Sequence, residues 1–389
     1  MEKLGHEYTA TPRNIGTHFS GGIDSFSVAG FAKKALASQG RNLTAGYSWS
    51  PPVSDEYPIL GKRDERHVIH ALGERLGLPI RYGAANGLNI YRYLDLEIEL
   101  NGIADLMDEL PVNEAAKADG VRVMLSGWGG DEAYSAHGAG YLSYTIKTFQ
   151  FREMRKALRF HTGAKRFRPL KTARAFFTWG LVPMLPNALF RRFTPIKETY
   201  DESSFPNSAM KAMAADLALD DKEEIRLVGD PRVFLANLLK LGHLNMRMET
   251  WAAWSSEFGF QSRYPLLDHR IIEFILGMPR HLFMADGQNR YMARAVVKDL
   301  VPEGLMKYDP ANELLRNDSR LSCWRMLRND LLTDVFAGDS AWVNMEKLRK
   351  AIDNVPENIE REHIPTMAKI QAALRVWKME QRLRSNRRV

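Results

Sequence analysis

The chain has 389 residues, 45% of them hydrophobic, which is enough for two or three domains or one large α/β unit. Its single cysteine, Cys323, excludes an intramolecular disulfide and fits a reducing compartment. The N-terminal stretch is polar, and no apolar run reaches the roughly 18–20 residues that a membrane span needs, so we expect a soluble cytoplasmic protein without a membrane partner.

The net charge of +7 is unevenly distributed along the chain. Residues 151–198 contain twelve Lys and Arg against two Glu. A basic surface attracts anions such as a nucleotide, a nucleic acid, an acidic peptide or acidic lipid headgroups, although such a run can also be a solvated helical face. The sequence leaves the role of this stretch open.

Short apolar runs alternate with helical periods between residues 15 and 125. In chain order the pattern predicts a strand in NIGTHF, a helix over Ser25–Ser38, a strand over Leu43–Trp49, a helix from Asp64 to Gly77, a strand in PIRYGA and a strand over Val121–Leu125. Such alternation predicts an α/β fold with a parallel sheet and helices on both faces. Ligands are then expected at the carboxyl ends of the strands.

The strand signals fade after about Tyr134. Residues 141–200 are predicted to be helical with interruptions at four prolines, and residues 231–384 are predicted to be mostly helical. We therefore expect three parts: a nucleotide-binding core over 1–140, a basic helical insertion over 141–230 and a helical remainder over 231–389.

The first glycine motif, Ser20-Gly21-Gly22-Ile23-Asp24-Ser25, follows the first predicted strand. Its glycines allow a sharp turn close to a ligand, and successive N–H groups beside a helix N-terminus form an anion-binding nest. Asp24 would repel a bare phosphate, so the motif favours phosphate held together with a cation, most simply Mg²⁺. The motif is not a Walker P-loop, and a capped strand-to-helix turn is the simpler alternative.

The second motif, Ser126-Gly127-Trp128-Gly129-Gly130-Asp131-Glu132, follows the strand predicted over Val121–Leu125. Three glycines around an aromatic residue, followed by two acids, predict a loop that lies close to a ligand and carries a second metal-binding carboxylate. Because adjacent strand ends meet at one edge of a parallel sheet, we expect Asp24 and Asp131 to share one Mg²⁺ beside a nucleotide.

Four segments resemble the asparagine-synthetase branch of the ATP pyrophosphatases, the PP-loop superfamily. They are SGGIDS, LSGWGGDE, SRYPLLDHRIIEFILGMP and GQNRYMARAVVKDLVPEGL, and they cover roughly residues 15–310 in order. SGGxDS alone also admits tRNA-modifying and NAD- or GMP-forming relatives, whereas the second and third segments point to the asparagine-synthetase branch. The resemblance implies a parallel-sheet PP-loop core with a largely helical C-terminal part.

The resemblance also implies a chemistry. ATP adenylates a substrate carboxylate, pyrophosphate leaves, and an amine attacks the acyl-adenylate to give an amide and AMP. Mg²⁺ and an anion nest would stabilise the charge on the leaving pyrophosphate. By position in the family motifs, pyrophosphate and metal are assigned to Ser20, Gly21, Gly22, Asp24 and Ser25, the nucleotide to Ser126 and Gly127, and the second metal contact to Asp131.

The chain departs from the family pattern in its amine source and in one loop position. Asparagine-forming members carry an N-terminal glutaminase domain with a cysteine at residue 2, where this chain has Glu2, so the amine is expected to be free ammonia, an amine substrate or ammonia from another chain. Trp128 stands where asparagine synthetases usually have Glu and β-lactam-forming relatives have Tyr. Indole cannot accept a proton, so Trp128 is predicted to line a pocket for a substrate bulkier than aspartate, or to pack in the core.

A third departure concerns the lysine that the family places after its LP dipeptide. Lys307 is the nearest match, although its register is shifted, and it is predicted to be catalytic. We expect structural roles for Arg263 and Asp268, with Asp268 capping a helix that begins near His269. The segment Ser54–Arg66 resembles asparagine-synthetase-like proteins of natural-product clusters, including lasso-peptide cyclases, which join a side-chain carboxylate to the N-terminal amine of a peptide.

Four functions remain open on the sequence. The first is an ATP-dependent, AMP-forming amide synthetase acting on a small-molecule or peptide carboxylate, such as a macrolactam cyclase with a precursor peptide and a protease as partners. The second is an ammonia-dependent amidotransferase subunit with a separate glutaminase. The third is a tRNA-modifying ATP pyrophosphatase; nucleic acid is disfavoured because the segment YPLLD argues against it and no cysteine pair is present. The fourth is a degenerate scaffold, which the intact Asp24 and Asp131 disfavour.

Overall fold

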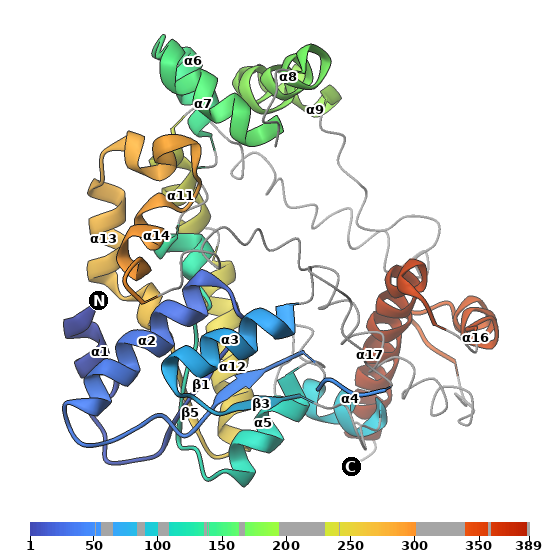
Figure 1. Cartoon of the computed structure of the whole chain (residues 1–389). Helices are drawn as coiled ribbons and strands as arrows, with labels where there is room; N and C mark the ends of the chain where they lie inside the picture. Colours follow the sequence, from blue (N-terminus) through green and yellow to red (C-terminus); the bar gives the residue numbers. More distant parts are fainter. Residues whose placement is uncertain are drawn as a thin grey trace.

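The structure is a computed structural model of the chain. It describes residues 1–50, 52–55, 65–83, 90–99, 109–135, 138, 140–162, 168–193, 230–240, 242–300, 339–356 and 359–386. Within these ranges a five-stranded sheet forms with the order β3-β2-β1-β4-β5, and every pair of neighbouring strands is parallel (Figure 1). Its strands are β1 (Ile15–His18), β2 (Gly46–Ser48), β3 (Ile80–Tyr82), β4 (Val123–Leu125) and β5 (Gln261–Arg263).

Helices make up most of the remaining described structure. The N-terminal half contains α1 (Glu2–Tyr8), α2 (Ile23–Ala37), α3 (Glu65–Leu76), α4 (Ile90–Glu99), α5 (Glu109–Ala118), η1 (Gly130–Tyr134), α6 (Tyr141–Lys147), α7 (Phe151–Thr162), α8 (Pro169–Ala175), η2 (Phe176–Leu181), η3 (Val182–Met184) and α9 (Asn187–Phe193). The C-terminal half contains α11 (Pro231–Lys240), α12 (His243–Glu257), η4 (Pro265–Leu267), α13 (His269–Gly277), η5 (Arg280–Gly287), α14 (Tyr291–Val297), α16 (Met345–Asp353), η6 (Arg361–His363) and α17 (Ile364–Asn386).

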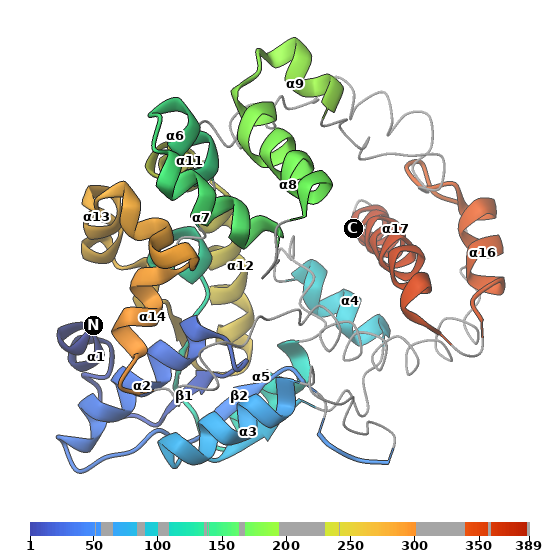
Figure 2. The same cartoon turned by 45° about the horizontal axis from the view of Figure 1, so that its top comes forward.

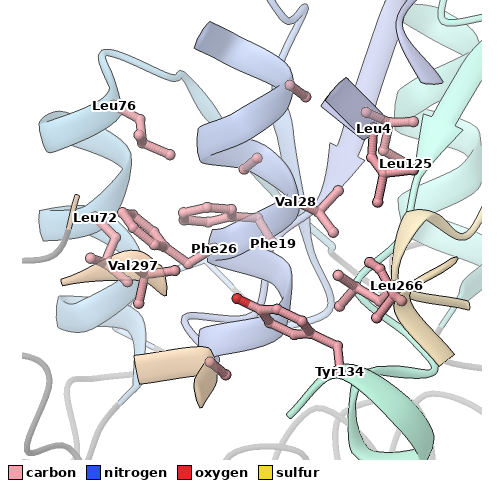
Figure 3. Close-up of a cluster of buried hydrophobic side chains, with 14 of the residues drawn as sticks. Leu4, Phe19, Phe26, Val28, Leu72, Leu76, Leu125, Tyr134, Leu266 and Val297 are labelled. Carbon is pink, nitrogen blue, oxygen red and sulfur yellow. The ribbon is translucent and has the colours of Figure 1, made fainter. Parts of the chain in front are cut away.

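Side chains of β4 alternate between two hydrophobic cores, one on each face of the sheet. Val123 and Leu125 belong to the core that contains residues of α2, α3, α13 and α14, part of which Figure 3 shows. Met124 belongs to the other core, which contains residues of α5, α12, α16 and α17. Because side chains alternate along a strand, this division places helices on both faces and confirms the predicted α/β architecture.

The predicted elements of the core are confirmed, with shorter strands. The helix predicted over Ser25–Ser38 is α2, and the predicted end of the next helix at Gly77 is observed, with φ of +53° and a Leu78 N–H bond to the carbonyl of Gly73. The strand predicted over Leu43–Trp49 is only three residues long in β2. The predicted cap Asp64 lies outside the described residues.

The sequence analysis missed β5 when it read no strand after Tyr134. Gln261–Arg263 pairs with β4 and extends the sheet at its edge, with Gln261 opposite Val123 and Arg263 opposite Leu125. Three polar residues carry no apolar alternation, so no periodicity in the sequence signals this strand. It places the YPLLD segment directly beside the second glycine motif.

The predicted helical stretch over 141–200 is confirmed from α6 to α9, and residues 194–229 lie outside the described residues. In Figures 1 and 2, α8 and α9 lie at the periphery, far from the sheet. The C-terminal helix α17 packs against α4 and is joined to it by an ion pair between Lys378 and Asp95 at 3.0 Å.

Candidate nucleotide and substrate site

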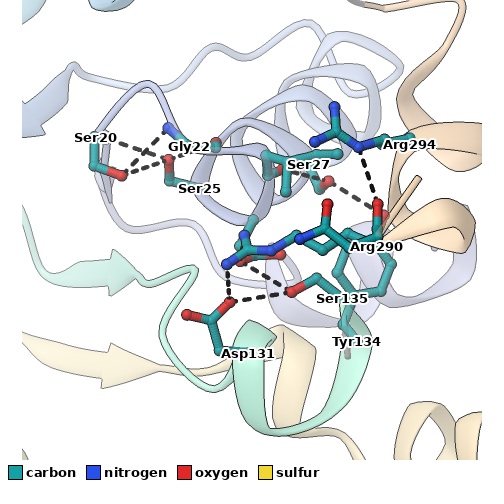
Figure 4. Close-up of polar contacts among 12 residues, drawn as sticks. Ser20, Gly22, Ser25, Ser27, Asp131, Tyr134, Ser135, Arg290 and Arg294 are labelled. Carbon is teal, nitrogen blue, oxygen red and sulfur yellow. Dashed lines mark hydrogen bonds and ion pairs between the residues drawn. The ribbon is translucent and has the colours of Figure 1, made fainter. Parts of the chain in front are cut away.

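The first glycine motif forms the turn between β1 and α2. Gly21 has φ of +70°, which favours glycine, and α2 begins after Gly22 without a side-chain cap. The hydroxyls of Ser20 and Ser25 lie 3.2 Å apart, and the Gly22 N–H points toward the Ser20 hydroxyl at 3.4 Å (Figure 4). The first-turn amides of the 15-residue helix α2 lie at this loop, and the anion site expected there stays a prediction.

The glycines of the second motif allow it to pack against the first motif. A Cβ atom on Gly127 would lie 2.5 Å from the Ser25 backbone nitrogen. A Cβ atom on Gly130 would lie 2.3 Å from Cγ of Asp24. Gly129 has φ of +86°, and a Cβ there would lie 2.3 Å from Leu267. The sequence analysis expected these glycines to approach a ligand; in the structure they approach the first loop and the YPLLD segment.

The two acids of the motifs face each other, as predicted, and a cation lies between them. The guanidinium of Arg290 contacts Oδ2 of Asp24 at 3.2 Å and Oδ1 of Asp131 at 2.5 Å (Figure 4). The Ser135 hydroxyl lies 3.3 Å from an oxygen of each carboxylate. The side chains of Asp24 and Arg290 are each 15% exposed, whereas Asp131 is 51% exposed at the mouth of the site.

Arg290 is a site residue that sequence reasoning did not select. It precedes α14 and has φ of +54°, a conformation that non-glycine residues rarely adopt, and its two carboxylate contacts hold it there. The signal was present in the quoted segment GQNRYMARAVVKDLVPEGL, whose basic pair is Arg290 and Arg294. Arg294 donates from Nε to the carbonyl of Asn289 at 3.1 Å, which fixes the same turn.

The oxygen atoms at this position suit Mg²⁺. Two carboxylates and a hydroxyl are hard donors, and Mg²⁺ is commonly held by one or two carboxylates together with substrate phosphates. No cluster of three or more acidic, histidine or cysteine side chains able to hold a metal occurs among the described residues, so the remaining ligands would have to come from phosphate and water. Asp24, Asp131 and Ser135 would hold the ion, and Arg290 would have to leave the position between the acids.

Trp128 belongs to an aromatic cluster at the edge of the sheet. Its ring lies 5.2 Å from the ring of Trp251 and 5.9 Å from that of Tyr264, both nearly perpendicular to it. The Arg247 guanidinium covers both indoles, at 5.3 Å from Trp128 and 4.8 Å from Trp251. Trp128 stays partly exposed while it packs on the core, and its role in a substrate pocket stays a prediction.

His18, at the end of β1, joins this cluster to the second motif. Its Nδ1 lies 3.3 Å from the Ser126 hydroxyl. The same hydroxyl accepts a hydrogen bond from the backbone N–H of Trp128 at 3.2 Å. Its Nε2 lies 3.8 Å from the Glu109 carboxylate. Complete burial lowers the pKa of His18 to about 4, so the imidazole is neutral near pH 7.

The two residues assigned structural roles have them. Asp268 caps α13, which begins at His269, by accepting from the Arg270 N–H at 3.0 Å, and its hydrogen bonds with Arg270 lower its pKa to about 2. Arg263 donates to the carbonyl of Tyr8 at 2.8 Å and ties β5 to the end of α1. The predicted catalytic residue Lys307 and most of the segment Ser54–Arg66 lie outside the described residues.

The comparison with known proteins agrees with this geometry. The family model for asparagine synthase matches residues 8–378, which includes both glycine motifs, Arg290 and the aromatic cluster. No curated protein matches the chain significantly. A match over nearly the whole chain, to a family of ATP-dependent amide-bond synthetases, means that this chain belongs to the asparagine synthase family.

Proposed function

We propose that this ATP-dependent carbon–nitrogen ligase adenylates a substrate carboxylate and then transfers the acyl group to an amine, releasing pyrophosphate and AMP. The observation that carries the proposal is the meeting of Asp24 and Asp131, from motifs more than a hundred residues apart, beside the uncapped N-terminus of α2. An anion-binding helix end next to paired acids supports the binding of polyphosphate with a divalent cation.

In this proposal Arg290 changes partner during the reaction. Bound Mg²⁺ would supply charge neutralisation for the developing pyrophosphate. Asp24 and Asp131 would hold that ion, and the Arg290 guanidinium between them would then pair with a phosphate oxygen of the nucleotide. The amides of Ile23 and Asp24, together with the hydroxyls of Ser20 and Ser25, bind the phosphate from the opposite side.

The acyl substrate is proposed to lie against Trp128 and Arg247. Trp128 is partly exposed and carries the Arg247 guanidinium on its ring at 5.3 Å, which suits a substrate with an apolar surface and a negative charge, such as a peptide that carries its reacting carboxylate. This supports a peptide macrolactam cyclase of the lasso type over an enzyme that amidates free aspartate. Trp128 cannot remove a proton from the amine, because indole is not a base.

The test is exchange of labelled pyrophosphate into ATP, which reports adenylation alone, followed by mass spectrometry of the amide product. A panel of acidic peptides and small carboxylates should reveal exchange with the wild-type protein and none with Asp24→Asn. Asp353→Asn, an exposed acid of α16, is the matched control and should retain the exchange. Exchange with free aspartate and ammonia would favour the amidotransferase alternative, and exchange unaffected by Asp24→Asn would refute the proposed site.

A further inference from the structure

The segment from Phe149 to Phe193, which we call the basic lobe, exposes an unusual number of large apolar side chains. It contains α7, α8, η2, η3 and α9. Sixteen large hydrophobic residues are exposed in the described part of the chain, and nine of them lie in this lobe. They are Phe149, Phe151, Phe160, Leu170, Phe177, Trp179, Met184, Leu189 and Phe193, with exposed fractions between 36% and 85%.

The basic lobe is also strongly cationic. Its sequence contains eleven Lys and Arg and a single acid, Glu153, which pairs with Lys156 at 3.0 Å. The side chains of Arg155, Arg159 and Lys171 are exposed beside the apolar ones. A soluble surface rarely combines so many exposed aromatic residues with charge of one sign, so the lobe suits a partner that is apolar and anionic together.

The tip between α6 and α7 is strained in a way that packing does not explain. Phe149 follows the C-terminal cap of α6 and has φ of +57°. Two backbone hydrogen bonds form the turn: the Phe149 N–H donates to the carbonyl of Ile146, and the Gln150 N–H donates to the carbonyl of Thr145. Glycine is the usual residue at this position, because a side chain costs roughly 1–2 kcal/mol. Phe149 is nevertheless 76% exposed and contacts another exposed ring, Phe151, at 6.4 Å.

The remaining exposed rings of the lobe form two groups that connect its helices. Trp179 of η2 stacks on His161 of α7 at 5.5 Å, and Phe160 lies beside the same imidazole. Phe177 of η2 meets Phe193 of α9 at 5.2 Å. Figures 1 and 2 both place α8 and α9 far from the sheet.

We propose that the basic lobe docks on the surface of an anionic lipid bilayer. Helices that carry Lys and Arg together with Trp, Phe and Leu lie in the headgroup region, where the cations meet anionic headgroups and the apolar side chains enter the acyl boundary. No helix among the described residues is long and apolar enough to cross a membrane, and docking of this kind needs none. The sequence analysis expected no membrane partner, although it named acidic lipid headgroups among the anions that the basic stretch could attract.

The proposal predicts that the full chain sediments with anionic vesicles, made of phosphatidylcholine and phosphatidylglycerol. A much smaller fraction of the protein should sediment with neutral vesicles of phosphatidylcholine alone. Substituting Arg155, Arg159 and Lys171 together by Gln should weaken the partitioning roughly 100-fold, since each cation near an anionic surface contributes about a fivefold factor. Raising the salt concentration should have a similar effect. The matched control, with Arg75, Lys117 and Lys350 changed to Gln, removes equal exposed charge from α3, α5 and α16 and should bind as the wild type does.

Phe149→Gly separates lipid binding from folding. The substitution should raise the unfolding temperature, because glycine removes the strain at φ of +57°, and yet lower vesicle binding several-fold. Phe274→Ser, which removes an exposed ring from α13, should leave binding unchanged. Equal binding to neutral and anionic vesicles, or binding unaffected by the charge substitutions, would overturn the proposal. Binding of poly-glutamate peptide but not of vesicles would overturn it in favour of an acidic protein partner.

Discussion

Replacing Gly127 by alanine tests whether the two glycine motifs form one rigid unit. The new Cβ atom would lie 2.5 Å from the Ser25 nitrogen, 2.7 Å from Ser25 Cα and 2.8 Å from the carbonyl carbon of Asp24. Carbon atoms in contact are normally about 3.5–4.0 Å apart, so the first loop would have to move by roughly 1 Å. All three contacts are with backbone, which cannot rotate aside as a side chain can.

The expected cost is that of an overpacked interior, about 1–3 kcal/mol, which for a chain of this length corresponds to an unfolding temperature lower by about 1–4 °C. Because the displaced atoms belong to the proposed phosphate loop, the stabilisation of the protein by saturating Mg·ATP should also disappear. A shift of this size at a reacting centre commonly reduces rates about 100-fold.

Differential scanning calorimetry with and without Mg·ATP measures both effects. Gly277→Ala is the matched control, because a Cβ there meets no atom within 4 Å and its φ is not in the left-handed region. It should unfold at or above the wild-type temperature. A Gly127→Ala protein that unfolds and responds to Mg·ATP like the wild type would refute the packing argument.

Three further predictions concern charged groups. Burial lowers the pKa of His18 from 6.5 to about 4, so the unfolded chain binds more protons than the folded one between about pH 6.5 and about pH 4. Stability should therefore fall, by on the order of 2–3 kcal/mol, as the pH is lowered through this range, and urea titrations should show a smaller loss in His18→Asn. Arg290→Gln removes the guanidinium that lies between Asp24 and Asp131, so Mg²⁺ alone should raise the unfolding temperature of this variant at about tenfold lower Mg²⁺ concentration than in the wild type. If both proteins respond to the same Mg²⁺ concentration, the guanidinium and Mg²⁺ do not compete for the position between the two carboxylates. Asp268→Ala should lower the unfolding free energy by about 1–2 kcal/mol through loss of the α13 cap, whereas Asp268→Asn should retain most of it.

The order and type of the core elements could be predicted because they depend on local properties of the chain. Apolar periodicity located α2 and the strands that precede each loop, and Gly77 ended α3 where its positive φ requires glycine. The general rule that parallel strand ends meet at one edge placed Asp24 and Asp131 together. The cap at Asp268 followed from capping chemistry alone.

Other features depend on residues far apart in the chain, and no local pattern contains them. Arg290 reaches Asp24 across 266 positions, and only the packing of α14 beside α2 brings its guanidinium between the two acids. Strand β5 has no apolar alternation and becomes a strand because the edge of β4 offers it hydrogen-bonding partners. The sequence by itself thus determined which residues form the loops and acids of this site. Only the tertiary structure decided that Gly127 and Gly130 of the second motif pack against the backbone and side chain of the first motif, because this contact depends on how two distant segments of the chain are arranged.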